Sequence, residues 1–549
     1  MKKSLLFLIG AFAVSALQAQ WVNDPTTNTK LGTALEYGVQ IYTATYETTG
    51  DTYVQWEGSN SSYNGSRAIC LQRIDVDGVL QWGSDGIHID SHQLATYTEG
   101  YAMNATSDGG VVTSFANYEK ECIAMKFDKN GNTLWGEQGI SVFDFPLGSY
   151  GCSRVELLAG TDGGTWVLAF DKQDSYLRYI NADGTLNPTV TFSDPEDKRT
   201  SCHLTPGSNG IVFVTYELLE DGDVSGYEEK QIWVTGFTTD GNRAINPTKL
   251  MDTLTAKITD SHYGISDGNG GGYVYIFHSG IAGVQNTYVF HYDANGTSTI
   301  SDPYGAMVHT IDLAHHYYSS HATVDPVSHD IILVYLQTTS GAQTNHKLNA
   351  NRITPTGEVL WDEGILIADD DGYGYTNAKI DAYPDGSGFM VSYLHGSYSA
   401  AAIEARGFDM NGNLTWNKQI NSVYGHRIYA KNNTGFHNGQ NILAWLNQDD
   451  RTIYGQNIDM NGTMGPTASV NENGSSLSAS IFQNGSNLII SSESLSQVEI
   501  ISITGQSIKT VKTNGNAAEI NVSGMTKGLY IVRMNDANGN VVVKKTVIR

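Results

Sequence analysis

The sequence contains few basic residues, few prolines and few cysteines for its length. Its 549 residues include 32 Lys and Arg against 57 Asp and Glu, a formal net charge of −25, with 11 Pro and 4 Cys. Proteins that bind nucleic acid or anionic membranes draw most of their affinity from Lys and Arg, so both classes of partner are excluded. A disordered chain is excluded too, because 40% of the residues are hydrophobic and 10% are aromatic.

The four cysteines are Cys70, Cys122, Cys152 and Cys202. None forms a CxxC pair or lies at zinc-ligand spacing from histidine, so no zinc site is predicted. An even number in an exported protein permits two disulfides, with three possible connectivities, and four buried free thiols are equally compatible.

Only one long hydrophobic run is present, and it lies at the N-terminus. Lys2 and Lys3 precede an apolar run from Ser4 to Leu17, the pattern of a secretory signal peptide. We expect residues 1–19 to be removed, with a retained membrane anchor as the alternative. No other stretch is apolar enough to span a membrane, so no transmembrane segment is expected in the mature chain.

The strongest signal is an internal repeat built on a hairpin turn. Asp or Asn followed by Gly favours a tight turn, because the Asx side chain bonds the backbone and Gly accepts positive φ. The gaps between turn glycines run from 50 residues (Gly412 to Gly462) to 61 residues (Gly296 to Gly357), and in four copies Trp follows at +4. The eight glycines are Gly78, Gly131, Gly184, Gly241, Gly296, Gly357, Gly412 and Gly462, and the tryptophans are Trp82, Trp135, Trp361 and Trp416.

An apolar, aromatic-rich strand precedes each turn by about 20 to 30 residues. Each repeat of about 50 residues therefore holds four short strands, which cannot bury their faces alone and must stack. We predict an all-β fold, with an eight-bladed β-propeller over residues 21–470 and with seven blades or a β-solenoid as alternatives. Residues 21–45 should supply a strand that closes the ring. The eight strands are Tyr53–Trp56, Val111–Phe115, Trp166–Phe170, Ile211–Tyr216, Tyr273–Phe277, Ile331–Leu336, Phe389–Leu394 and Ile442–Leu446.

After the repeats the chain becomes poor in large apolar residues, and residues 471–487 are predicted to be a linker. Several short strand patterns follow in residues 478–549, which suggests a small Ig-like β-sandwich. They are Leu488–Ser491, Val498–Ile503, Ser507–Thr510, Glu519–Val522, Leu529–Met534 and Val541–Ile548.

This C-terminal segment resembles the type A sorting domain of the Bacteroidetes type IX (Por) secretion system. The matching features are Gly505 after a strand, the cluster Gly528-Leu529-Tyr530, and the basic terminal strand with Lys544 and Lys545. The resemblance implies passage through the periplasm, recognition by the type IX machinery, and a secreted or surface-attached product. Deleting the tail should then leave a folded propeller in the periplasm.

Motifs that carry catalytic chemistry are weak in this sequence. The stretch Gly264–Gly268 fits G-x-S-x-G but lies in a Gly-rich strand turn, not in an α/β fold. The turns at Asp128 and Asp409 could bind calcium weakly, although the same residues serve any hairpin. The histidines between Asp312 and His321 are read as a surface loop rather than a metal site. No catalytic residue, metal or cofactor is therefore assigned.

The topology of a four-stranded blade nevertheless predicts one functional face. Loops between the second and third strands lie at the same end as the connections between blades, here at Glu57–Arg67, Glu217–Lys230, His278–Asn286 and Gln337–Lys347. The inter-blade connections are rich in tyrosine, with His262 and His426 among them, and Tyr presents an apolar face with a polar tip. The candidate ligand-binding residues are Tyr97, Tyr101, Tyr150, Tyr263, Tyr317, Tyr318, Tyr373, Tyr375 and Tyr424.

Three functions remain open. A non-catalytic propeller could bind glycan or an extracellular protein through this face, an extracellular hydrolase could act on glycosides or peptides in the funnel, and a surface-layer protein would need no small ligand. Two carboxylates about 5–10 Å apart in the funnel would favour glycoside hydrolysis, whereas a tyrosine platform would favour binding. The tyrosines could alternatively fill gaps between blades.

Overall fold

The computed structural model divides the chain into two units, Met1–Pro466 and Thr467–Arg549. The structure describes residues 21–35, 40–94, 101–145, 154–170, 174–192, 202–224, 227–257, 262–279, 285–309, 315–339, 346–369, 378–397, 400–425, 427–429, 435–465, 479–502, 507–535 and 541–548. The signal peptide predicted at residues 1–19 lies outside these ranges. In the described residues nearly all regular structure is β, and none forms a helix with the length and apolarity needed to cross a membrane.

The described part of the first unit contains eight four-stranded antiparallel sheets, numbered here in chain order. Sheet 1 holds β2 (Tyr42–Thr45), β3 (Thr52–Ser59), β4 (Arg67–Ile74) and β5 (Ile87–Ile89). Sheet 2 holds β6 (Tyr101–Ala105), β7 (Val111–Ala116), β8 (Cys122–Phe127) and β9 (Ile140–Ser141). Sheet 3 holds β10 (Arg154–Ala159), β11 (Thr165–Phe170), β12 (Ser175–Ile180) and β13 (Val190–Phe192). Sheet 4 holds β14 (Cys202–Pro206), β15 (Val212–Val224), β16 (Tyr227–Phe237) and β17 (Arg243–Lys257).

The remaining sheets follow the same order. Sheet 5 holds β18 (His262–Ser266), β19 (Gly272–Ser279), β20 (Gln285–Tyr292) and β21 (Ala306–Met307). Sheet 6 holds β22 (His315–Val324), β23 (Ile331–Thr339), β24 (Lys347–Ile353) and β25 (Ile365–Ala368). Sheet 7 holds β26 (Lys379–Ala382), β27 (Gly388–Ser397), β28 (Ala400–Asp409) and β29 (Leu414–Gly425). Sheet 8 holds β30 (Arg427–Tyr429), β31 (Gln440–Asn447), β32 (Thr452–Asp459) and, from the N-terminus, β1 (Thr29–Thr33).

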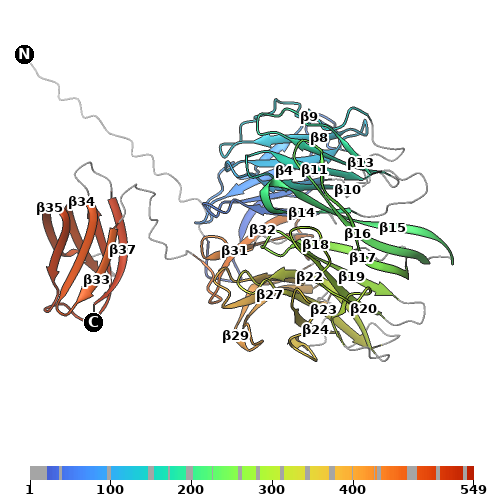
Figure 1. The fold of residues 1–549 in the computed structure, drawn as a ribbon. Helices are drawn as coiled ribbons and strands as arrows, with labels where there is room; N and C mark the ends of the chain where they lie inside the picture. Colours follow the sequence, from blue (N-terminus) through green and yellow to red (C-terminus); the bar gives the residue numbers. More distant parts are fainter. Residues whose placement is uncertain are drawn as a thin grey trace, which may run out of the picture. The chain divides into compact units, whose positions relative to one another are not determined.

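Sheet 8 joins the two ends of the unit, because β1 pairs antiparallel with β32. In Figure 1 the orange strands β31 and β32 accordingly lie beside the blue N-terminal strands. The prediction that residues 21–45 supply the closing strand is confirmed. The unit has a β-propeller-like all-β fold.

The turn chemistry read from the sequence is also confirmed. All eight turn glycines have positive φ, between 74° and 90°. In each turn the glycine N–H donates to the carbonyl oxygen three residues earlier, at 2.8–3.0 Å. The eight apolar strands predicted before these turns all lie in the second strand of a sheet, from β3 to β31.

The cores of this unit lie between sheets. Eight clusters of buried hydrophobic side chains each combine residues of two consecutive sheets, and the eighth combines sheet 8 with sheet 1. In the closing cluster Leu31 and Trp21 from the N-terminus pack with Trp56 of sheet 1 and Ile453 of sheet 8. Each sheet therefore depends on both neighbours to bury its faces.

A second contact recurs at four of the junctions between neighbouring sheets. The indole Nε1 atoms of Trp82, Trp135 and Trp416 donate to backbone oxygens at 3.2, 3.2 and 2.8 Å, always to the residue two before the turn glycine of the following sheet. Trp21 makes the same bond, at 3.0 Å, to Val76 of sheet 1. The N-terminal segment thus supplies sheet 8 with the tryptophan that its own turn lacks.

The first strands of consecutive sheets contact one another from β2 to β26, so they line the axis of the unit. Two ends follow from the antiparallel order. The turn rim, as we call it, carries the eight glycine turns, seven of which are Asx–Gly. The long-loop face is the opposite end, where first strands begin and second strands pass into third strands.

The second unit is one five-stranded antiparallel sheet in its described residues. It contains β33 (Ala479–Asn484), β34 (Asn487–Ser502), β35 (Ser507–Asn521), β36 (Gly528–Asn535) and β37 (Val541–Ile548). Two of the predicted strands merge into the single strand β34, and two others merge into β35. The two long strands remain paired with one another across bulges. The predicted linker 471–487 includes β33, which pairs with β34 and so belongs to the sheet.

Three of the four cysteines are described, and all three are buried: Cys70, Cys122 and Cys202. Burial raises the pKa of the Cys70 thiol to about 12, with a smaller contribution from the charge of Asp90. Of the two possibilities left open by the sequence, Cys70 and Cys122 follow the buried thiol. Cys152 lies outside the described residues.

Candidate functional site

The structure separates two of the nine tyrosine candidates clearly. Tyr101 is buried between sheets 1 and 2, where its hydroxyl donates to Gln40 O at 3.2 Å and its ring meets Tyr42 edge-on at 5.3 Å. It fills a gap between sheets and is therefore corrected from ligand candidate to core residue. Tyr263, in contrast, is 47% exposed.

The other seven tyrosines are not described in enough detail to place their rings. Tyr97, Tyr150, Tyr373 and Tyr375 lie outside the described residues, and Tyr317, Tyr318 and Tyr424 lie in strands where the backbone alone is described.

The ring of Tyr263 packs against a second aromatic ring. Its ring stacks on Tyr275 with centroids 5.4 Å apart and an interplanar angle of 22°. Tyr275 is buried, and burial raises the pKa of its hydroxyl. The ring of His203 lies 5.7 Å from Tyr263 on the neighbouring first strand. The exposed Tyr263 ring is therefore supported from below by Tyr275 and lies beside the imidazole of His203.

His203 is held by a carboxylate from a third sheet. Its Nδ1 lies 2.7 Å from Oε1 of Glu156 in β10, and the Leu204 N–H donates to Oε2 of the same carboxylate at 3.1 Å. The side chains of His203 and Glu156 are 8% and 21% exposed. Glu156 thus fixes the imidazole ring of His203 near the surface.

A buried ionic group underlies this pair. Oε1 of Glu217 lies 2.9 Å from both the backbone N and the Nδ1 of His262, and its Oε2 lies 3.4 Å from Lys230 Nζ. Burial alone would raise the pKa of Glu217, but the His262 hydrogen bond and the charges of His262 and Lys230 outweigh it and hold the pKa at about 2. All three side chains are at most 1% exposed.

The two layers touch through their imidazoles. The rings of His262 and His203 meet edge-on at 4.8 Å, and His262 Nε2 lies 3.1 Å from Thr215 Oγ1. Glu217 therefore orients His262, and His262 supports His203. We name this group the inner-strand cluster: Glu156, His203, Glu217, Lys230, His262, Tyr263 and Tyr275.

The cluster lies on the long-loop face of sheets 3 to 5. Its outer residues are within the first three residues of β10, β14 and β18, the strands that line the axis. The predicted loop Glu217–Lys230 is corrected: it is the outer half of the β15–β16 hairpin, whose pairing runs to Glu220 opposite Glu229 and beyond. In Figure 1 this green hairpin extends past the neighbouring sheets.

Reasoning from sequence named His262 and Tyr263 but missed Glu156, His203, Glu217 and Lys230. The contacts that join them span about one repeat, such as Glu156 to Leu204 and Glu217 to His262, and no local motif marks them. One usable signal was present: Glu217 and Lys230 end apolar runs that could have been read as longer strands.

The turns and histidines considered as cation sites can be placed in the described residues. No three His, Cys, Asp or Glu side chains there converge as a metal site would require. At the Asp128 turn, Oδ1 already accepts the N–H groups of Asn130 and Asn132 at 2.8 and 2.9 Å. His321, from the predicted histidine loop, lies in β22, where burial and the charge of Lys379 lower its pKa to about 3.

The second unit carries the match to a known family. Residues 483–549 match the secretion system C-terminal sorting domain of Por substrates. The protein is therefore a type IX secretion substrate, exported to the cell surface or beyond. Within this domain Gly528 begins β36, and Tyr530 is buried with its hydroxyl donating to Thr526 O at 2.8 Å. Lys544 is half-buried in β37, the Lys545 side chain is not described, and Gly505 lies outside the described residues.

Several solved structures align with the chain at low identity, among them three enzymes named for carbohydrate substrates. A polysaccharide lyase aligns with 67% of this chain and 91% of its own, at 10% identity and a TM-score of 0.41. An ulvan lyase bound to a sulfated disaccharide repeat aligns with 74% and 96%, at 12% identity and a TM-score of 0.35. An α-L-arabinofuranosidase from Fusarium graminearum aligns with 71% and 99%, at 10% identity and a TM-score of 0.35. No curated protein sequence matches the chain.

Proposed function

We propose that the first unit is an eight-bladed propeller that closes through its N-terminal strand. Eight sheets, eight cores between sheets and the Trp21 bond into sheet 1 support this count. We also propose that residues 1–19 are a signal peptide that delivers the chain to the periplasm, where the type IX machinery recognises the tail.

We further propose that this propeller is a non-catalytic binding protein whose ligand is a neutral glycan. The observation that carries the proposal is the exposed Tyr263 ring, stacked on Tyr275 beside the His203–Glu156 pair. The apolar face of a sugar ring packs on an aromatic ring, and its hydroxyls suit a carboxylate and an imidazole. The formal charge of −25 disfavours acidic sugars.

The proposal is tested by calorimetric titration of the full chain with neutral glucan, xylan and mannan hexasaccharides. At least one should bind, and Tyr263→Ala should weaken that binding at least tenfold, because aromatic anchors carry much of such affinity. The matched control is Tyr118→Ala, which removes a 61% exposed tyrosine of the same face in sheet 2. Equal affinities of Tyr263→Ala and wild type would contradict the site.

The second candidate function is an extracellular hydrolase acting on glycosides or peptides. It is favoured by one observation, the carboxylate that orients His203, since an imidazole held this way can act as a general base. Against glycoside hydrolysis, the second carboxylate of the cluster is buried against Lys230. Release of new reducing ends or amines by wild type, lost in His203→Gln, would establish the hydrolase.

A further inference from the structure

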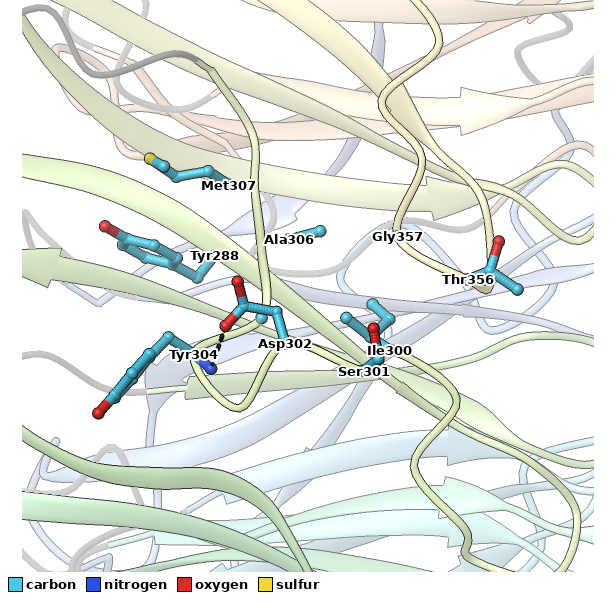
Figure 2. A pocket seen from close by; sticks show the side chains of 10 residues that line it. Tyr288, Ile300, Ser301, Asp302, Tyr304, Ala306, Met307, Thr356 and Gly357 are labelled. Carbon is cyan, nitrogen blue, oxygen red and sulfur yellow. Dashed lines mark hydrogen bonds between the residues drawn. The ribbon is translucent and has the colours of Figure 1, made fainter.

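A hollow of about 570 Å³ opens at the turn rim between sheets 5 and 6. Figure 2 shows Tyr288 and Tyr304 on one side of it, Ile300 and Thr356 on the other, and Asp302 between them. Its volume is within the range of about 300–1,000 Å³ typical of small-molecule sites. It is lined by the outer strands β20 and β21 of sheet 5 and the segment between them, whereas the outer residues of the inner-strand cluster lie on first strands.

The repeat accounts for one wall of the hollow. In sheets 1, 2, 6 and 7 the residue four after the turn glycine is tryptophan, whereas in sheets 4 and 5 it is isoleucine, Ile245 and Ile300, and in sheets 3 and 8 it is proline. Ile300 packs under Gly357, the turn glycine of sheet 6, as Trp135 packs under Gly184. The backbone oxygen that would receive an indole N–H, that of Pro355, is bonded by Thr299 Oγ1 instead. Sheet 5 therefore retains a hydrogen bond to the backbone of sheet 6 but has no indole ring at this position.

The lining combines aromatic and polar groups. Tyr304 is 46% exposed, and its backbone N–H donates to Asp302 Oδ1 at 2.9 Å, which fixes the carboxylate inside the hollow. Burial, and secondarily the charge of Asp302, raise the pKa of Tyr288, so its hydroxyl remains a donor at neutral pH. Among the described residues of the lining, Asp302 is the single charged group, which gives too few ligands for a calcium ion and the wrong sign for an anion.

We propose that this hollow is a second ligand site, which binds the ring of a neutral saccharide against Tyr288 and Tyr304, with Asp302 accepting its hydroxyls. The ligand class is shared with the proposed function, but the residues are different. Each site can therefore fail without the other.

The test is Ile300→Trp, which places in sheet 5 the side chain that the repeat carries in four other sheets. The full chain is titrated with the same neutral hexasaccharides, and binding stoichiometry is compared with Ile300→Val, which keeps the hollow open. We expect about two equivalents of sugar for wild type and Ile300→Val, and about one for Ile300→Trp. Should the tryptophan impair folding, Tyr304→Ser removes an exposed ring instead and should give the same loss of one equivalent.

The outcomes separate the two sites. Binding that responds to Tyr263→Ala but not to Ile300→Trp or Tyr304→Ser would overturn the second site and leave the proposed function intact. Binding that responds to the sheet 5 variants alone would support the second site and overturn the first. Absence of binding by wild type at millimolar sugar, or capture of an aromatic peptide in place of sugar, would overturn the saccharide assignment.

Discussion

The turn rim and the long-loop face are opposite ends of the same strands, and they are built differently. At the turn rim every sheet ends its third strand in a turn with a positive-φ glycine, seven of them Asx–Gly, and in several sheets a tryptophan N–H repeats the same bond to the next sheet. In the described residues of the long-loop face, sheets 1 and 4 each pair an acid of the second strand with a base of the third, Glu57 with Arg67 and Glu217 with Lys230, but sheet 4 buries its pair completely in an extended hairpin. The comparison indicates that the repeating end holds the ring together and the irregular end provides distinctive chemistry.

The largest effect on stability is expected at the closing contact of the turn rim. A Cβ added at Gly78, where φ is +85°, would meet Trp21 N at 2.6 Å, so Gly78→Ala should lower the free energy of unfolding by about 3–4 kcal/mol through clash and strain. Gly83→Ala is the matched control, because its φ is +79° but nothing lies within 4 Å. It should cost only about 1 kcal/mol. Equal losses in urea denaturation would contradict the importance of the Trp21 contact.

The next largest effect tests the buried charges of the long-loop face. Glu217→Gln removes the charge that compensates Lys230, and should lower the free energy of unfolding by about 3 kcal/mol at pH 7. Asp252→Asn, which breaks the exposed pair with Lys249 at 3.1 Å, should change it by less than about 1 kcal/mol.

The same variant has a predicted pH signature. Because the folded pKa of Glu217, about 2, is below its ordinary value of 4.5, its stabilising contribution is complete above pH 4.5 and is lost as the pH falls toward 2. The stability difference between wild type and Glu217→Gln should therefore shrink over that acid range. A difference that stays constant from pH 6 to pH 2.5 would argue against the ionised pair.

A smaller loss is expected for a single bond between sheets. Trp82→Phe keeps most of the ring but removes the N–H that donates to Lys129 O, so unfolding should become easier by about 1 kcal/mol. Tyr118→Phe on the long-loop face, where the ring is 61% exposed, should leave the melting temperature unchanged. If both substitutions were neutral, the indole bonds would not be fastening the sheets.

The smallest effect on stability should come from the residue with the largest effect on binding. Tyr263 is nearly half exposed, so Tyr263→Ala should cost less than about 1 kcal/mol while glycan affinity falls at least tenfold. A large drop in melting temperature would instead assign Tyr263 to the fold.

The sequence predicted the repeating end far better than the irregular one. Four residues such as Asp128–Gly131 encode a turn locally, so all eight turns and the second strands could be read directly. The inner-strand cluster depends on pairs such as Glu156 with His203, which come from different repeats and meet only after the sheets stack. The hairpin at Glu217–Lys230 was read as a loop because charged residues hid its strand pattern. The repeat at Ile300, in contrast, is visible in the sequence as one of those without tryptophan four residues after the turn glycine.

The most direct test of the account is a crystal structure of the protein bound to the neutral oligosaccharide with the highest affinity. The account predicts a sugar ring lying on Tyr263, with hydroxyls within hydrogen-bond distance of Glu156 or His203. An oligosaccharide bound elsewhere on the ring, with the Tyr263 face bare, would contradict the assignment of the inner-strand cluster as the binding site.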